Sequence, residues 1–215
     1  MILLDRLVDD AGLFPPTSLS MPDALARHRA VSSPMLSGRF LVPGDRLDEL
    51  STLLDGPIDV HVIGPGATAD ERICVRAREG REISEMPCYV EGVRPRDLHG
   101  AYGKLRCAGA AVEDVAGYVT EAVAAGVPFK ATAGMHAAVC GWDGPDNHGY
   151  LNLLLAVGRA LTGGDVAEIV ACTDADLLVQ EAKEADAPAI RELFHSYGSC
   201  DTIRPVDDAR KLGLI

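Results

Sequence analysis

The sequence KLRCAGA at 104–110 and the sequence PFKATAGMH at 128–136 are the two stretches that decide the expected fold. Each is a strand-like run, and one amphipathic helix over 111–125, with valine and alanine along one face, connects them. Gly126 follows this helix as a stop signal. Two apolar strands joined by a helix form the repeating unit of a parallel sheet, so these residues predict an α/β fold.

The alternation of strands and helices continues along the whole chain. Strand-like runs are expected at 2–10, 39–44, 58–66, 72–79, 85–93, 104–109, 128–134 and 195–200. Helical patterns are expected at 22–31, 45–56, 111–125, 151–164, 206–212 and from 187 onward, whereas 175–181 is ambiguous. Eight mostly apolar strands in 215 residues predict a compact, single-domain (β/α)8 barrel of the TIM type over residues 1–215. An open doubly wound parallel sheet is the alternative.

The composition excludes several classes of partner. The formal net charge is −12, so the surface repels nucleic acid and anionic lipid. A small anionic substrate stays compatible with this charge, because a local basic pocket overrides the net field. No secretory signal or membrane span is recognisable, and the six cysteines lack CxxC spacing, which predicts a reduced, cytoplasmic protein. The acidic surface is compatible with a monomer or a homo-oligomer.

Lys130 is the candidate nucleophile. In a barrel, catalytic groups come from the carboxyl ends of the strands and from the loops that follow. Lys130 follows Pro128–Phe129 and precedes small residues, so its surroundings are expected to be apolar and roomy. Burial and the nearby ammonium of Lys104 would lower its pKa and give the free amine that a Schiff base requires. The alternative is a structural ion pair of Lys130 with Asp10 or Glu91 inside the barrel.

Carboxyl and imidazole groups at the same end of the barrel are candidates for proton transfer. Asp10 (or its neighbour Asp9) and Glu91 are expected to act as general acid or base beside the reacting carbonyl. His136 is a third catalytic candidate, in the loop after 128–134. Neutralising a lysine is the alternative role of each carboxylate. The histidines without a recognisable partner, expected to be structural or on the surface, are His28, His61, His99 and His195.

A second group of residues is expected to bind the substrate. Lys104 and Arg106 lie on the same side of their strand and suit a carboxylate or a phosphate, with an ion pair that closes the barrel as the alternative. In YGSCD at 197–201 the glycine lets backbone N–H groups approach an anion, although a buried thiol is the ordinary role of the cysteine. The substrate-binding candidates are Lys104, Arg106, Thr132, Gly198, Ser199 and Cys200.

The stretch HAAVCGWDGPDNH at 136–148 supports a different interpretation. Four of its residues are of types that bind metals, namely His136, Cys140, Asp146 and His148. Their spacing matches no standard zinc pattern. We therefore expect no cofactor, and a divalent metal bound by these residues is the alternative.

Five motifs, in the same order along nearly the whole chain, resemble those of a bacterial family of predicted barrel proteins. They are DDAGLFPP, KLRxxG, FKATAGxH, HGYLNLL and YGSC…PVDDxxxLGL. The corresponding family motifs are KxRTGG, FKATAGLHHP, HGFLNLL and GSCSFDEPVDDL. The resemblance implies the barrel fold, and because the family has no firmly assigned reaction it implies little about chemistry.

The chain departs from these family motifs at several positions. It has CAGA at 107–110 where the family has TGG, Ala137 in place of a second histidine, Cys140 in place of a basic residue, and DTIR at 201–204 in place of a segment that ends in an acidic residue. These departures imply a changed substrate or a lost activity. KATAG at 130–134 is also similar to the lysine motif KTSTG of deoxyribose-phosphate aldolases, which form a Schiff base on a barrel strand.

Together these features predict an enzyme that acts on a small anionic carbonyl metabolite. The expected reaction is that of an aldolase-like lyase or an isomerase, through a lysine Schiff base. A metal-assisted lyase or hydrolase that uses the residues of 136–148 is the first alternative. A non-catalytic relative, which binds a metabolite or a partner subunit, is the second alternative.

Overall fold

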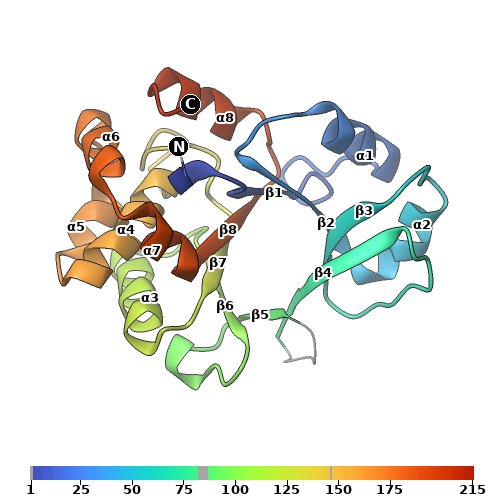
Figure 1. Ribbon diagram of the computed structural model, residues 1–215, viewed down its shortest axis with the longest axis horizontal. Coiled ribbons are helices and arrows are strands. Elements are labelled where there is room, and N and C mark those ends of the chain that lie inside the picture. Colours follow the sequence, from blue (N-terminus) through green and yellow to red (C-terminus); the bar gives the residue numbers. More distant parts are fainter. Residues whose placement is uncertain (1, 82–86, 146) are drawn as a thin grey trace.

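The structure, a computed structural model, describes residues 2–81, 87–145 and 147–215. Its eight parallel strands close into a barrel in chain order, and β8 pairs with β1 (Figure 1). The strands are β1 Val8–Asp10, β2 Leu36–Pro43, β3 Ile58–Ile63, β4 Ile73–Gly80, β5 Cys88–Glu91, β6 Tyr102–Arg106, β7 Phe129–Thr132 and β8 Phe194–Ser199. The expected (β/α)8 barrel is confirmed, and the open doubly wound sheet is wrong.

Helices and short turns connect the strands. The α-helices are α1 Met21–Ala30, α2 Leu47–Ser51, α3 Val112–Ala125, α4 Tyr150–Thr162, α5 Val166–Ala171, α6 Ala175–Glu184, α7 Ala187–Leu193 and α8 Arg204–Lys211. The 3-10 turns are η1 Ile2–Leu4, η2 Gly44–Arg46 and η3 Pro95–Asp97. Helix α3 ends at Gly126, whose φ of 62° lies in the left-handed region that glycine adopts most readily.

Three segments differ from the elements expected from the sequence. The run 2–10 is a strand only in β1, because its first residues form η1 and pack into the core. The ambiguous segment 175–181 belongs to helix α6, which Asp174 caps by accepting hydrogen bonds from two backbone N–H groups of the first turn. The segment 45–56 contains only η2 and the short helix α2.

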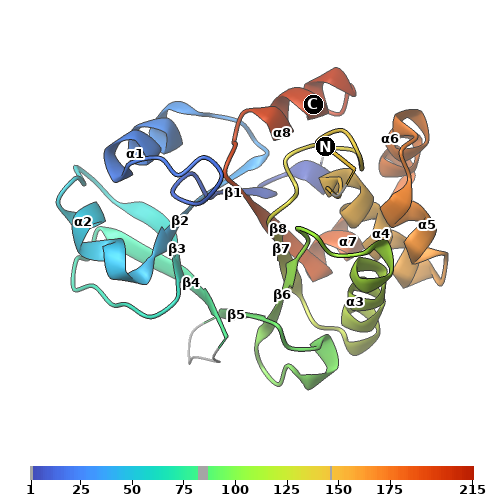
Figure 2. The ribbon, with the colours of Figure 1, turned by 180° about the vertical axis from the view of Figure 1, so that it is seen from behind.

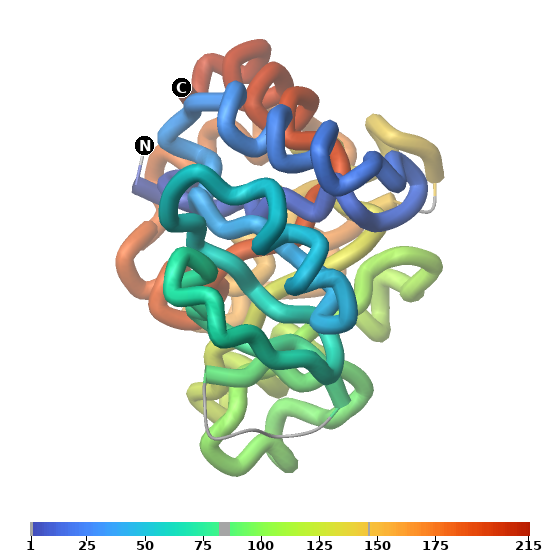
Figure 3. Tube along the Cα trace, turned by 90° about the vertical axis from the view of Figure 1, so that its right-hand side faces the viewer, coloured from blue at the N-terminus to red at the C-terminus, as the bar shows by residue number. Residues whose placement is uncertain are grey.

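The helices cover the barrel unevenly. Helices α3 to α7 lie on the side of β6, β7 and β8, and α1 and α2 lie on the opposite side (Figures 1 and 2). Among the described residues, only the turn η3 is helical between β5 and β6. The two chain ends lie close together, as the side view also shows (Figure 3).

Side chains alternate along the strands, so that apolar residues pack under the helices and polar residues point into the barrel. Toward α1 and α2 the outward residues are Phe40, Val42, Val60 and Val62, and toward α3 and α4 they are Leu105, Phe129 and Ala131. The buried polar residues of the interior include Asp9, His61, Glu79, Lys104 and Lys130. The centre of this barrel is therefore an ionic layer rather than the stack of branched apolar side chains common in the fold.

Candidate active site in the barrel

Two lysines and two acidic residues form the centre of the ionic layer. The Nζ of Lys130 donates hydrogen bonds to Oδ2 of Asp9, at 2.7 Å, and to Oε1 of Glu79. The Nζ of Lys104, on the neighbouring strand, lies 3.1 Å from Oε2 of the same glutamate and 3.4 Å from Oε2 of Glu91. Glu79 therefore bridges the two ammonium groups.

Asp9 has a full set of partners although its side chain is completely buried. Its Oδ1 accepts hydrogen bonds from Oγ of Ser37 at 2.6 Å and from Nε of Arg39 at 2.7 Å. Its Oδ2 accepts from Oγ of Ser196 at 2.8 Å and from Lys130. Burial raises the pKa of Asp9, but the charges of Lys130 and Arg39 lower it more, so the pKa lies well below its usual range.

The expectation for Lys130 is wrong in two respects. Its surroundings are ionic rather than apolar, and its partners are Asp9 and Glu79 instead of Asp10 or Glu91. Burial lowers the pKa of Lys130, but the two carboxylates raise it more, so the net shift is upward. Burial also raises the pKa of Glu79, but the charge of Lys130 and the hydrogen bond with His61 lower it more, so this pKa too lies well below its usual range. Lys130 is thus a buried ammonium and not a free amine.

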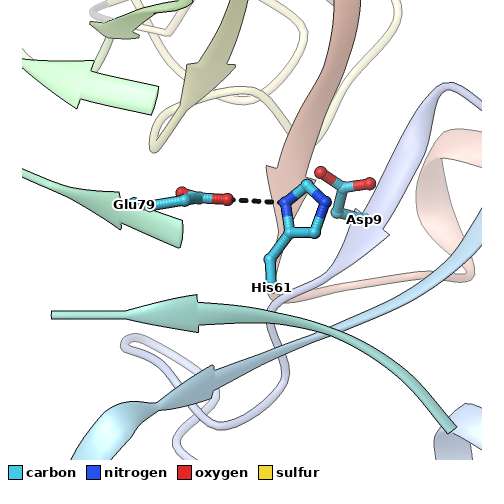
Figure 4. Close-up of side chains that lie close together, drawn as sticks. All are labelled: Asp9, His61 and Glu79. Carbon is cyan, nitrogen blue, oxygen red and sulfur yellow. Dashed lines mark hydrogen bonds and ion pairs between the residues drawn. The ribbon is translucent and has the colours of Figure 1, made fainter. Parts of the chain in front are cut away.

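Asp9, His61 and Glu79 are the residues that come closest to a metal site within the described part of the chain. Their ligand atoms lie within 4.8 Å of one another, and Nδ1 of His61 lies 3.0 Å from Oε1 of Glu79 (Figure 4). These residue types fit a divalent ion. The ammonium of Lys130, however, is bonded to both carboxylates and already neutralises them. A metal would have to displace this lysine.

Of the residues expected to bind a metal, the three that the structure describes, His136, Cys140 and His148, do not form such a group. His148 is buried, and its Nε2 lies 3.0 Å from the carbonyl oxygen of Ala110. His136 lines the cavity described below, whereas Cys140 does not. Asp146 lies outside the described residues. The metal-assisted interpretation on 136–148 stays a prediction.

Aromatic side chains pack beneath the ionic layer. The ring of Tyr89 lies 5.6 Å from Nζ of Lys130, and its hydroxyl lies 2.7 Å from Nδ1 of His195. Tyr102 packs against both rings, at 5.2 and 5.1 Å between centroids. Burial, aided by the charges of Arg39 and Arg191, lowers the pKa of His195 to about 4. His195 and His61 are therefore interior residues of the barrel and not surface ones.

A cavity of about 710 Å³ opens at the carboxyl ends of the strands. This volume suits a small-molecule ligand. Gly198 keeps the wall open, since a Cβ there would lie 3.1 Å from Cδ2 of Leu41. The guanidinium of Arg106 lines the cavity and has no hydrogen bond or ion pair with any described residue. The candidate site residues that line the cavity are Glu91, Lys104, Arg106, Thr132, His136, Gly198 and Cys200.

The remaining site candidates lie outside the cavity wall. Asp10 points away from it and pairs with Arg27 and His28 of helix α1, so it is not placed for proton transfer. Ser199 is buried and lies 3.2 Å from Nδ1 of His136. Lys130 lies beneath the cavity. Asp10 was expected to face the site, but side chains alternate along β1. Because Val8 packs into the outer core, Asp10 lies on the same side as Val8, and Asp9 faces the barrel interior.

Sequence reasoning missed Glu79, His61 and Arg39. In VHV at 60–62 a histidine lies between two outward valines, and this alternation was a usable signal that His61 points into the barrel. Glu79 had no comparable signal, because its strand carries charges on both sides in RARE, 76–79. A register shift between β3 and β4 after Val60 further hides which of these residues faces inward.

The depressed pKa values of Asp9 and Glu79 predict loss of stability in acid. A carboxylate whose pKa is lower in the folded chain stabilises the fold above its unfolded pKa, about 4, and this contribution disappears as the pH falls toward the folded value. We expect the free energy of unfolding, measured with urea, to decrease steadily below about pH 5. Asp55→Asn removes an exposed carboxylate and should leave this decrease unchanged. A constant stability down to pH 3 would contradict the ionic layer.

Comparisons with protein-family models, with curated proteins and with solved structures found no match. None of the described helices has the length and apolar character needed to cross a membrane. Any assignment of function therefore depends on the cavity and on the side chains that line it.

Proposed function

We propose that the protein is an enzyme that acts on a small anionic carbonyl compound in this cavity, as an aldolase-like lyase or an isomerase, and that Lys104 forms the Schiff base. TIM barrels are commonly enzymes, with their sites at the carboxyl ends of the strands. The observation that carries the proposal is that Lys104 lines the cavity between two carboxylates, beside Arg106, which pairs with none of the described residues.

Lys104 suits a nucleophile better than Lys130 does. The chain has four lysines, and two of them lie in the barrel interior. The Lys130 side chain is fully buried and holds two carboxylates, whereas the Lys104 side chain is 9% exposed and shares Glu79 with it. An imine at Lys104 leaves the pairs of Lys130 intact. An imine at Lys130 would disturb the ammonium that Asp9 and Glu79 share, and each carboxylate would keep only its other cationic partner, Arg39 or Lys104.

The anionic part of the substrate is expected to bind Arg106. A guanidinium that none of the residues in 2–81, 87–145 and 147–215 engages offers its planar donors to a carboxylate or a phosphate. The hydroxyl of Thr132 and the open wall at Gly198 face the same cavity and provide polar contact and space. Because the charges of the ionic layer compensate one another, Arg106 supplies the local positive charge that the acidic surface lacks.

Glu91 is the residue proposed to move protons. A Schiff base requires the ammonium of Lys104 to lose a proton, and Oε2 of Glu91 lies 3.4 Å from that Nζ. The carboxyl side chain is 31% exposed, so it exchanges protons with solvent after each step. Once the imine has formed, the same carboxylate removes a proton from the carbon next to the imine carbon. Loss of this proton gives the enamine through which aldol addition and isomerisation proceed. In the cleavage direction a base removes the proton of the hydroxyl group, the C–C bond breaks and the same enamine forms, and protonation of its carbon then completes the cycle.

Exchange of that proton for deuterium tests the proposal before the natural substrate is known. We expect the protein to catalyse exchange next to the carbonyl of at least one small keto acid or sugar phosphate in D2O, followed by proton NMR. Arg106→Gln should raise the half-saturating concentration of an anionic carbonyl compound about tenfold or more, and that of an uncharged ketone hardly at all. Binding of these anions without exchange would instead favour the non-catalytic, metabolite-binding alternative.

A further inference from the structure

Cys200 and His136 lie against each other in the wall of the cavity. The Sγ of Cys200 lies 3.8 Å from Nε2 and 3.9 Å from Nδ1 of the histidine ring. Both residues line the cavity, in the loops that follow β7 and β8. A cysteine beside a histidine is the arrangement in which a thiol becomes a nucleophile.

The hydrogen bonds around His136 decide which ring nitrogen serves the thiol. The hydroxyl of Ser199 donates to the carbonyl oxygen of Asp201 at 2.6 Å, so its oxygen accepts from Nδ1 of His136 at 3.2 Å. Nδ1 therefore carries a proton, and Nε2 remains to take the proton of Cys200. Cys200 as nucleophile, His136 as base and Ser199 as the group that orients the base thus contact one another in that order.

The backbone of Cys200 is also held in place. Its carbonyl oxygen accepts a hydrogen bond of 2.7 Å from Nη1 of Arg27, and the other end of that guanidinium pairs with Asp10. Asp10 in turn accepts from the backbone N–H of Gly12 at 2.9 Å. Asp10 and Arg27 are positioning residues for the thiol, which gives the DDAG sequence at 9–12 a role other than proton transfer.

The electrostatic environment favours the thiolate. Burial raises the pKa of Cys200, but its hydrogen bonds with His136 and Thr17 lower it more. The hydrogen bond with Cys200 raises the pKa of His136, against the effect of burial. Both shifts stabilise the form in which the sulfur is negative and the imidazole positive.

We propose that Cys200, paired with His136, is a second reactive centre of the cavity, which accepts small electrophiles that carry a carboxylate, and that Arg106 holds this carboxylate. Arg106 and Cys200 line the same cavity, so an anionic electrophile meets both the guanidinium and the thiol. This centre does not depend on a Schiff base at Lys104.

The reaction with a haloacetate shows the expected chemistry in its simplest form. The electron pair of the Cys200 thiolate forms an S–C bond, the C–I bond of iodoacetate breaks, and iodide leaves with its electron pair. The proton stays on Nε2 of His136, and no oxidant or reductant is needed. The product is a carboxymethyl thioether on Cys200.

Iodoacetate and the uncharged iodoacetamide form a matched pair of probes. With limiting reagent at pH 7 and peptide mapping by mass spectrometry, we expect Cys200 to be labelled first among the six cysteines. Iodoacetate should react there about tenfold faster than iodoacetamide, because Arg106 attracts the carboxylate. The partly exposed Cys74 and Cys140 serve as internal controls and should show no preference for the anion.

Two variants separate the parts of this centre. Arg106→Gln should slow the reaction of iodoacetate at Cys200 to about the rate of iodoacetamide. His136→Gln should slow the reactions of both reagents about tenfold or more, because the thiolate is lost. Circular dichroism confirms that each variant is folded, and the measurement on the unmodified protein stands without them. Faster labelling of Cys74 or Cys140 than of Cys200, or equal rates of the two reagents at Cys200 in the unmodified protein, would overturn the proposal.

Discussion

Replacing Lys130 with methionine is expected to lower the free energy of unfolding at neutral pH by about 3–5 kcal/mol, the scale of breaking a buried ion pair on one side. The ammonium is the shared partner of Asp9 and Glu79, and all three side chains are fully buried. Methionine fills a similar volume, so the loss comes from two buried carboxylates that each lose a cationic partner, Asp9 keeping only Arg39 and Glu79 keeping Lys104, rather than from a cavity. Urea unfolding measures this difference.

The pH dependence separates this cause from poor packing. Protonation removes the charge of Asp9 and Glu79, so the deficit of Lys130→Met should shrink as the pH falls below about 4. Adding Glu79→Gln to Lys130→Met should recover part of the loss at pH 7, because one of the two excess buried negative charges is gone. Lys183→Met, at the end of helix α6, is the matched control and should change stability little. A deficit that is independent of pH would contradict the ionic explanation.

Replacing Lys104 is expected to remove turnover while the fold persists. Loss of a covalent nucleophile costs roughly 10³-fold or more in rate. Lys104→Met and Lys104→Arg should both lower the deuterium exchange rate to this extent. Arginine keeps a positive charge beside Glu79 and Glu91 but cannot form the imine, so it distinguishes covalent chemistry from simple charge stabilisation.

The arginine variant also keeps this prediction open to refutation. Its urea unfolding curve should stay close to that of the unmodified protein, because both carboxylates retain a cationic partner. Exchange that continues in Lys104→Arg would show that the cavity stabilises the enolate by charge alone. If Lys104→Met abolishes exchange and Lys104→Arg retains it, a positive charge at this position is sufficient and the Schiff base is excluded.

The fold could be predicted because it depends on local patterns. Apolar runs, glycine stops and the helix at 111–125 recur along the chain and specify parallel strands in sequence order. The rule that barrel sites form at the carboxyl ends of strands then located the polar residues that the proposal uses, from Glu91 and Lys104 to Cys200. These predictions did not depend on the register between neighbouring strands or on which side chains point into the barrel.

The contacts inside the barrel could not be predicted, because they depend on the phase and register of each strand. Asp9 and Asp10 are neighbours in sequence, yet one holds Lys130 and the other holds Arg27 on the outside. Glu79 lies on β4 beyond a register shift against β3, and it contacts both lysines. A shift of one residue reverses which side chain enters the interior. Lys130 is a buried ammonium because Asp9 and Glu79 are the carboxylates that enter the interior beside it.

Trapping with borohydride tests the central claim, an imine at Lys104, most directly. The protein is incubated with small keto acids, aldehydes and sugar phosphates, reduced with sodium borohydride, and analysed by intact mass and peptide mapping. Because the chain has only four lysines, the modified one is identified without ambiguity. The proposal predicts a single adduct on Lys104 that is absent from Lys104→Arg. An adduct on Lys130, or reducible carbonyl compounds that undergo exchange without any adduct, would contradict it.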